Sequence, residues 1–289
     1  MSAATMPVPP APGAPAPEGG PGTASFGWLM KDTVVLTRRS LARIVREPET
    51  LADVTIQPLI FVLLFTYVFG SAIRIPGGGS YHEYLIGGML GMGLAGTAPG
   101  TAVGLVTDMS SGLIDRFRSL PMSRAAVLAG RTLADLLTQV IGVVVVSAVG
   151  LAIGWRVHTG PGDIAAAFGL ALLLGYAFSW AGACLGMTLR SAEAAQQIGF
   201  IFFLPLTFIS NAFVPTQEMP GWLQAVANWN PLSALAAACR HLFGNPDPAA
   251  RVQAWPMQHP ELAVVAWSGL MLCVFAPLAV RLYRRKALG

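Results

Sequence analysis

Long apolar runs separated by short polar connections are the dominant pattern of this chain. Each of six runs is long enough to cross about 30 Å of hydrocarbon as a helix. The pattern predicts spans at about residues 54–73, 84–106, 126–155, 164–189, 198–214 and 262–280. Several runs contain proline, which spanning helices tolerate when neighbouring groups satisfy the freed backbone. We therefore expect an all-α membrane protein with six transmembrane helices.

Small residues recur one turn apart in two of these runs. Gly96, Gly100 and Gly104 fall in the second run, and Gly182 and Gly186 fall in the fourth. Small side chains at this spacing let two helices approach closely. We interpret both sets as packing surfaces and not as parts of a pore.

Two further segments precede the first span. Residues 1–25 are rich in Pro, Ala and Gly and carry one charge, Glu18, so we expect a disordered tail. Residues 26–46 interleave apolar side chains with cations, and Pro48 follows them. This pattern predicts an amphipathic helix at the membrane surface, in contact with lipid phosphates. A helix packed on a partner protein is the alternative.

Composition and charge narrow the class of protein. The chain is 54% hydrophobic and 11% charged, against about 25% charged residues in soluble proteins. The net charge of +4 does not indicate nucleic acid, because the cations flank the apolar runs. With the N-terminus in the cytoplasm, all but four of the 18 Lys and Arg residues lie inside; the exceptions are Arg74, Arg156, Arg240 and Arg251. The positive-inside rule therefore predicts two cytoplasmic termini in a bacterial plasma membrane.

The connection between the second and third spans, about residues 108–124, has a pattern of its own. Ile114, Phe117 and Leu120 share one helical face, and Pro121 ends the helix. A short amphipathic helix between two spans is suited to docking into a groove of a partner protein. A helix resting on the bilayer is the alternative.

Arg131 and Asp135 lie one turn apart near the start of the third span. Charges at that depth are costly unless they are paired. The spacing favours an ion pair within the helix over a substrate site.

Prolines divide the segment before the last span into pieces too short to cross a membrane. Pro215, Pro220 and Pro231 lie within it, and Asn230–Pro231 is a strong helix start, with Asn as the cap and Pro at the first position. Trp222 and Leu223 belong to an apolar pattern of roughly helical period. We expect two short re-entrant helices within residues 213–242, with tryptophans at headgroup depth. Irregular backbone at membrane depth is stable only inside protein or along a cavity, which makes this segment a candidate outer gate.

Two stretches carry a resemblance to a known family. GLIDRFRSLPMSRAAVLAGR, residues 112–131, resembles the cytoplasmic coupling region of the ABC type-2 transporter permeases. SNAFVPTQEMPGWLQAVANWNPLSALAAACR, residues 210–240, resembles their outer signature. The branch most similar is that of the daunorubicin/doxorubicin resistance permeases of actinomycetes.

The resemblance implies a permease subunit of an ATP-driven exporter of a hydrophobic or amphipathic compound, such as an antibiotic. It implies two partner proteins: a second permease copy, and a separate ATPase that binds ATP and Mg. The coupling contact would comprise Asp115, Arg116, Phe117, Arg118, Leu120 and Pro121. The outer helices would be shaped by Pro215, Pro220, Trp222, Leu223, Asn230 and Pro231. An exporter of lipid or polysaccharide remains an alternative.

The sequence lacks the patterns of an enzyme. It contains no G-x-x-x-x-G-K-[ST] loop to bind ATP, and its three cysteines are too far apart for a zinc-binding spacing. We therefore expect a non-catalytic subunit without a cofactor of its own. A transporter driven by an ion gradient would need ionisable groups near the bilayer midplane, and these are nearly missing.

Overall fold

The computed structural model describes residues 48–73, 75–76, 78–110 and 124–286, and every regular element within them is a helix. The predicted tail and amphipathic helix (1–46) lie outside these residues, as do Asp115, Arg116, Phe117, Arg118, Leu120 and Pro121 of the predicted coupling contact. The all-α expectation therefore holds for the described part of the chain.

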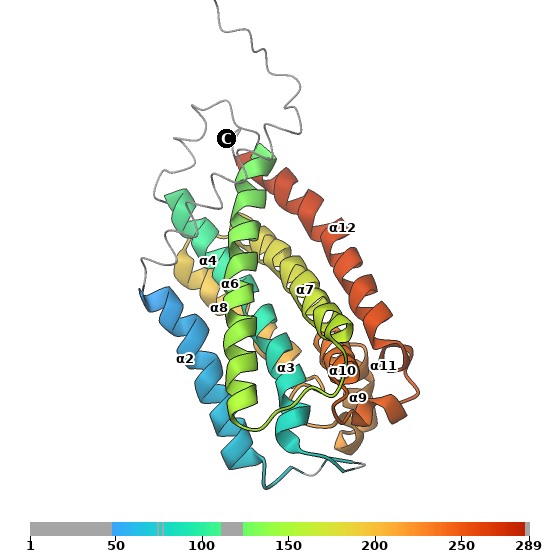
Figure 1. Cartoon of the computed structure of the whole chain (residues 1–289). Coiled ribbons are helices and arrows are strands. Elements are labelled where there is room, and N and C mark those ends of the chain that lie inside the picture. The colour runs from blue at the N-terminus through green and yellow to red at the C-terminus, as the bar shows by residue number, and fades with distance from the viewer. Residues whose placement is uncertain (1–47, 74, 77, 111–123, 287–289) are drawn as a thin grey trace, which may run out of the picture.

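Long helices form an elongated bundle (Figure 1). They are α2 (Pro48–Leu64) with a π-helical extension η1 (Phe65–Phe69), α3 (Tyr81–Ala95), α4 (Thr97–Ser110), α6 (Arg124–Ala152), α7 (Pro161–Thr188), α8 (Ala192–Phe208) and α12 (Pro260–Lys286). Short helices between α8 and α12 are η2 (Thr216–Glu218), α9 (Gly221–Asn228), α10 (Pro231–Phe243), η3 (Pro248–Arg251) and α11 (Trp255–Gln258). Among the described residues, four stretches are long and apolar enough to cross a membrane: Tyr81–Ser110, Leu128–Ala152, Pro161–Thr188 and Pro260–Tyr283. A shorter apolar helix covers Ile56–Phe69. The protein is therefore a multi-pass membrane protein.

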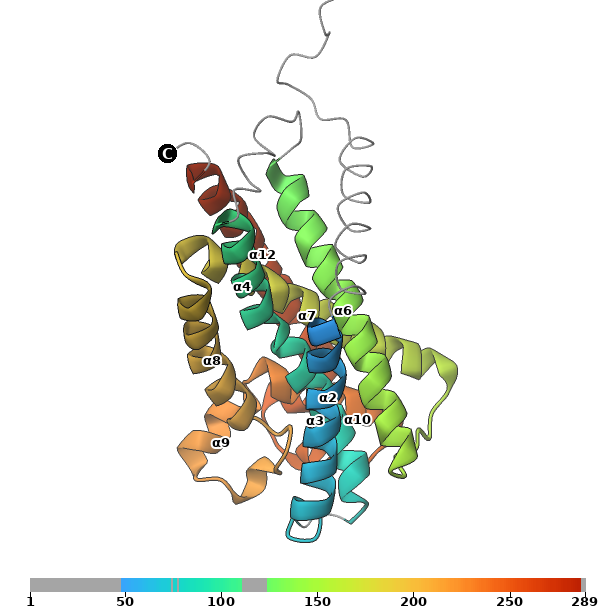
Figure 2. The same cartoon turned by 90° about the vertical axis from the view of Figure 1, so that its left-hand side faces the viewer.

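The bundle has two distinct ends (Figures 1 and 2). At one end α4 finishes, α6 begins and α12 finishes; we call it the α4–α6 end. At the other end lie α9, α10 and α11; we call it the α10 end. Within the bundle, α7 packs against both α4 and α12, α8 packs against α4, and α2 packs against α6.

The second predicted span differs from the structure in one respect. The single run expected at 84–106 is two helices, α3 and α4, that meet at Gly96. Gly96 keeps right-handed helical backbone angles, and its amide donates to the Met92 carbonyl at 3.0 Å. The composite helix still spans 30 residues.

The fifth predicted span begins and ends about six residues too late. The structure starts α8 at Ala192, because the Ser191 side chain accepts a hydrogen bond from the Ala194 amide. Glu193, Gln196 and Gln197 make this first turn polar, which moved the sequence-based boundary toward the apolar residues. The residues after Phe208 then form a turn that leads toward α10.

Close packing at the predicted glycine positions is observed in α7. A Cβ atom at Gly182 would lie 2.2 Å from the Ala98 carbonyl oxygen, and one at Gly186 would lie 2.7 Å from that of Ala102. The glycines of the second span differ among themselves: a Cβ at Gly100 would meet nothing within 4 Å, whereas one at Gly104 would meet the Arg131 side chain. The close contact between α4 and α7 therefore depends on the glycines of α7 and the alanines of α4.

Candidate functional site: polar clusters at the two ends of the bundle

A charged cluster joins α4 and α6 at the α4–α6 end. Arg131 Nε lies 3.4 Å from Asp135 Oδ1, and Arg131 Nη1 lies 3.4 Å from Asp108 Oδ2. Thr101 Oγ1 donates to Asp135 Oδ2 at 2.6 Å. A Cβ at Gly104 would overlap the guanidinium of Arg131, so the glycine leaves the space that this guanidinium occupies. The structure thus brings Arg131 and Asp135 together and adds α4 as a second partner.

Uncharged polar groups continue from this cluster toward the middle of the bundle. Gln139 Nε2 donates to Thr97 Oγ1 at 3.0 Å and to Ser179 Oγ at 3.1 Å. Gln139 and Ser179 are both buried. Hydrogen bonds therefore connect α4, α6 and α7 at a depth where water cannot supply them.

The predicted coupling segment is bounded by these same helices. Its described neighbours are the end of α4 at Ser110 and the start of α6 at Arg124. The Arg131 cluster ties these two helices together close to where the segment leaves and rejoins them.

At the α10 end, Asn230 organises the start of α10. Its side-chain oxygen accepts from the Leu232 amide at 2.8 Å, and Pro231 occupies the first helical turn. Its Nδ2 donates to the carbonyls of Leu206 and Ile209, each at 2.6 Å. One amide therefore caps the start of α10 and the end of α8 together.

The turn that follows α8, residues 209–213, exposes carbonyl groups that no helix satisfies. Tyr81 Oη donates to the Phe213 carbonyl at 3.1 Å, and Tyr84 Oη donates to that of Asn211 at 2.5 Å. The Asn211 amide in turn donates to Ser233 Oγ of α10 at 2.9 Å. Side chains of α3 and α10 thus satisfy this turn.

Arg240 occupies the centre of the same region with a side chain that is 0% exposed. Its Nε donates to the Tyr84 carbonyl at 2.8 Å, and its Nη2 donates to the carbonyls of Asn211 at 2.8 Å and Ala212 at 3.3 Å. The guanidinium also lies over the Tyr84 ring, 3.6 Å from its centroid. The buried charge is stabilised by the hydrogen bonds of Nε and Nη2, whereas Nη1 has no hydrogen-bond partner among the described residues.

The acidic neighbour of Arg240 is a weaker partner. Asp247 Oδ1 lies 3.8 Å from Arg240 Nη1, beyond hydrogen-bond distance. Burial raises the pKa of Asp247, whereas Arg240 and the Ala249 amide act in the opposite direction. The guanidinium therefore relies mainly on backbone carbonyls.

The far end of α10 is capped by the connection between α6 and α7. Gly244 ends the helix with a φ of +69°, a conformation that favours glycine. The His158 amide donates to the Phe243 carbonyl at 2.9 Å, and Thr159 Oγ1 donates to that of Leu242 at 2.5 Å. Trp155 Nε1 donates to Asn245 Oδ1 at 2.7 Å. α10 is thus held at both ends.

α9 is a surface helix, in contrast to the buried α10. Trp222 is 73% exposed and Trp229 is also exposed, while Ala227 and Asn228 face the protein. Pro220 precedes the helix, Leu223 lies in its first turn, and Pro215 precedes η2. The predicted outer residues therefore fall into two groups: Asn230 and Pro231 lie at the buried start of α10, and the others lie on or before α9.

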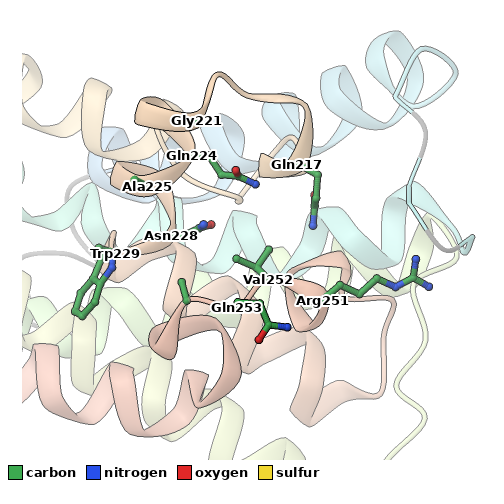
Figure 3. A pocket seen from close by; sticks show the side chains of 10 residues that line it. Gln217, Gly221, Gln224, Ala225, Asn228, Trp229, Arg251, Val252 and Gln253 are labelled. Atoms are coloured by element: carbon green, nitrogen blue, oxygen red, sulfur yellow. The ribbon is translucent and has the colours of Figure 1, made fainter.

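A shallow opening of about 450 Å³ lies between α9 and the segment around η3. Amide side chains from both segments line it, namely Gln217, Gln224, Asn228 and Gln253. Figure 3 shows the Arg251 side chain extending away from Gln224 and Asn228. Arg240 is not among the residues that line the opening.

Comparison with known proteins settles the family. Residues 31–243 match the family model described as ABC-2 type transporter. The chain belongs to the ABC-2 type transporter family. As a permease subunit of an ABC transporter, it is a non-catalytic membrane component.

Three relatives illustrate the breadth of the similarity. This ABC-2 permease is 34% identical over 239 residues to the daunorubicin resistance ABC transporter permease protein DrrB1 of Streptomyces coeruleorubidus, covering 83% of this chain and 81% of that one. It is 24% identical to the probable doxorubicin resistance ABC transporter permease protein DrrC of Mycobacterium tuberculosis, covering 92% and 93% of the two chains. It is 25% identical to the putative transport permease ycf38 of Porphyra purpurea, covering 76% of each chain.

Sequence reasoning missed the residues with the most partners in this ABC-2 permease. Arg240 was counted only as a cation of an outer connection, and Tyr81 and Tyr84 were given no role. The available signal was one arginine in an otherwise apolar, alanine-rich helix. A charge in such a setting indicates a buried partner, but the local spacing does not identify which residue that partner is.

Proposed function

We propose that this permease exports a hydrophobic or amphipathic compound, such as an antibiotic, with energy from ATP bound by a separate subunit. The observation that carries the proposal is the 34% identity, over 83% of the chain, to a permease named for daunorubicin resistance. The described helices present many apolar side chains on their outer faces, and polar contacts are confined to the interior and the ends.

The proposal includes six spans and two cytoplasmic termini in a bacterial plasma membrane. α8 would supply the sixth span, in addition to the four long apolar stretches and the shorter apolar helix described above. Its 17 residues correspond to about 25 Å of helix, close to the thickness of the hydrocarbon. Phe200, Ile201, Phe202 and Phe208 are exposed on it, as expected of a lipid or partner contact. The cations Arg190, Arg281 and Arg285 lie toward the α4–α6 end, which supports a cytoplasmic location for that end.

In this proposal the segment 108–124 docks on the ATPase. Asp115, Arg116, Phe117, Arg118, Leu120 and Pro121 would form the contact. The Arg131 cluster would then transmit its movement, because it ties α4 and α6 together beside the segment. ATP and Mg would be bound by the partner subunit and not by this chain.

The outer gate would consist of α9 and α10, paired with a second permease copy across the substrate pathway. Pro215 and Pro220 would set the bends, and Trp222 and Leu223 would lie at headgroup depth. Asn230 and Pro231 would fix the start of the buried helix. Support comes from the burial of α10 among α3, α7 and α12.

A purification and ATPase assay tests this function. We expect the chain, extracted in mild detergent with its neighbouring gene products, to retain a P-loop ATPase in stoichiometric amount. We further expect daunorubicin to stimulate the ATPase activity more than a lipid-linked oligosaccharide does. Stimulation by the oligosaccharide and not by daunorubicin would indicate that the substrate is a polysaccharide precursor and not an antibiotic. A chain that purifies without any ATPase would contradict the proposal.

A further inference from the structure

α3 and α10 pack closely at Gly87. A Cβ atom at Gly87 of α3 would lie 3.0 Å from the Ala236 carbonyl oxygen and 3.5 Å from Cys239 Cβ. A Cβ at Gly88 would overlap the Ala212 backbone of the turn after α8. Three segments distant in sequence, α3, α10 and the 209–213 turn, therefore meet without intervening side chains.

Arg240 is the one side chain in this contact that hydrogen-bonds directly to both of the other segments. Its Nε reaches the Tyr84 carbonyl of α3, while its Nη2 reaches the Asn211 and Ala212 carbonyls of the turn. Separation of α10 from both α3 and the turn would break all three hydrogen bonds and the contact with the Tyr84 ring. An apolar side chain could not replace this function, because it would supply no donor to the Tyr84, Asn211 and Ala212 carbonyls; the Asn211 carbonyl would keep a second donor, Tyr84 Oη.

We propose that Arg240 holds α10 against α3 and the 209–213 turn, and that substrate release requires this contact to open. Arg240 is then a positioning residue of the outer gate, since it acts through the backbone groups it binds. This inference rests on the proposed exporter function and makes it specific: α10 moves relative to α3, whereas a purely structural arginine would keep the two helices together throughout transport.

A disulfide between α3 and α10 tests the movement. The 3.5 Å separation between the Cβ position of Gly87 and Cys239 Cβ lies within the range of disulfides. The test uses a chain with Gly87→Cys, and with Cys184→Ala and Cys273→Ser to remove the other thiols. Oxidation of this chain should reduce the rate of ATP-driven transport at least tenfold. Reduction should restore it. Full transport by the oxidised, cross-linked protein would overturn the inference.

Labelling of the native Cys239 tests the role of Arg240 and does not depend on Gly87→Cys being tolerated. Cys239 is fully buried, so a membrane-impermeant maleimide added from the outside should label it slowly. In the Cys184→Ala, Cys273→Ser background, Arg240→Gln should raise the labelling rate at least fivefold in the absence of nucleotide. Arg240→Lys keeps the charge but loses the planar set of guanidinium donors. Its labelling rate should lie between those of the wild type and Arg240→Gln. Arg251→Gln, at an exposed arginine of the same end, should leave the rate unchanged.

Nucleotide dependence separates a gate from a merely structural contact. In the intact complex with its ATPase, Cys239 labelling should change severalfold between the nucleotide-free and the ATP-bound state, and Arg240→Gln should label rapidly in both. Tyr84→Phe removes one hydrogen bond to Asn211 and should give a smaller increase, so the test survives if Arg240→Gln fails to fold. Labelling that is unaffected by Arg240→Gln or Tyr84→Phe, or by nucleotide, would contradict the inference. Absence of transport by the unmodified complex would instead contradict the exporter function.

Discussion

At the scale of residues, the polar side chains with most partners serve backbone carbonyls. Asn230 and Arg240 both donate to carbonyls near the end of α8, and Tyr81 and Tyr84 do the same from α3. In hydrocarbon such carbonyls have no water to bind, so each must find a donor in the protein. The irregular backbone between α8 and α10 is therefore stable because these side chains surround it.

Substitution of Asn230 separates its two roles. Asn230→Asp keeps an oxygen that can accept from the Leu232 amide but loses the donors to Leu206 and Ile209. Asn230→Ala loses all three hydrogen bonds and should destabilise the protein by about 1–3 kcal/mol. We expect the unfolding midpoint in detergent to fall for both variants. Equal stability of Asn230→Ala and the wild type would contradict the assigned contacts.

Substitution within the Arg131 cluster should show coupling between its members. Arg131→Leu leaves the Asp135 carboxylate without its guanidinium and should lower the unfolding midpoint. The double variant with Asp135→Asn should recover part of the loss, giving an interaction energy of about 0.5–3 kcal/mol in a double-mutant cycle. Strictly additive effects would show that the 3.4 Å contact contributes nothing measurable.

How far residue roles follow from the sequence depends on the distance of their partners. The Asn230–Pro231 helix start could be predicted because a cap and its helix are adjacent in sequence. The spacing of Arg131 and Asp135 likewise indicated a local contact. Arg240 bonds to residues 28, 29 and 156 positions away, and no local pattern carries that information.

At the scale of elements, helix contacts are set by the small residues of α7 and the breaks in the apolar runs. Hydropathy located α6 and α7 to within three residues and the start of α12 to within two, because their apolar stretches are long. It missed the division of α3 from α4 and the polar first turn of α8. A hydropathy pattern records which residues prefer lipid, whereas these boundaries depend on hydrogen bonds of single backbone and side-chain groups.

Two glycines of α7 provide a matched pair. Gly182→Ala would place a Cβ 2.2 Å from the Ala98 carbonyl oxygen and force α4 away from α7, at a cost of about 1–3 kcal/mol. Gly169→Ala meets nothing within 4 Å and should be neutral or slightly stabilising because alanine favours the helix. The comparison is made by thermal unfolding of the two variants in the same detergent. A similar change in stability for both variants would contradict the packing role of Gly182.

At the scale of the whole molecule, the polar clusters lie at opposite ends of one bundle. The Arg131 cluster ties α4 to α6, and the Arg240 contacts tie α10 to α3. Since α3 and α4 follow one another with only Gly96 between them, the two clusters act on one composite helix. This arrangement supplies a physical route by which a movement at the α4–α6 end would reach the α10 end.

The coupling proposal predicts a loss of transport without a loss of membrane insertion. Phe117→Ala should reduce ATP-driven efflux at least tenfold, because an apolar anchor in a partner's groove carries much of the docking energy. Membrane insertion, measured by the yield of folded protein, should be unchanged. Leu133→Ala, at a partly buried position of α6 outside the segment, serves as a control for nonspecific loss of packing. Efflux by Phe117→Ala at the wild-type rate would remove this residue from the coupling contact.

Drug uptake into inside-out membrane vesicles tests the central claim most directly. Vesicles carrying the permease and its ATPase should accumulate daunorubicin when ATP is added, and should continue to do so after a protonophore collapses the proton gradient. A substitution that inactivates ATP hydrolysis in the partner should abolish the uptake. Accumulation that needs the proton gradient and proceeds without ATP would contradict the account and identify a gradient-driven carrier instead.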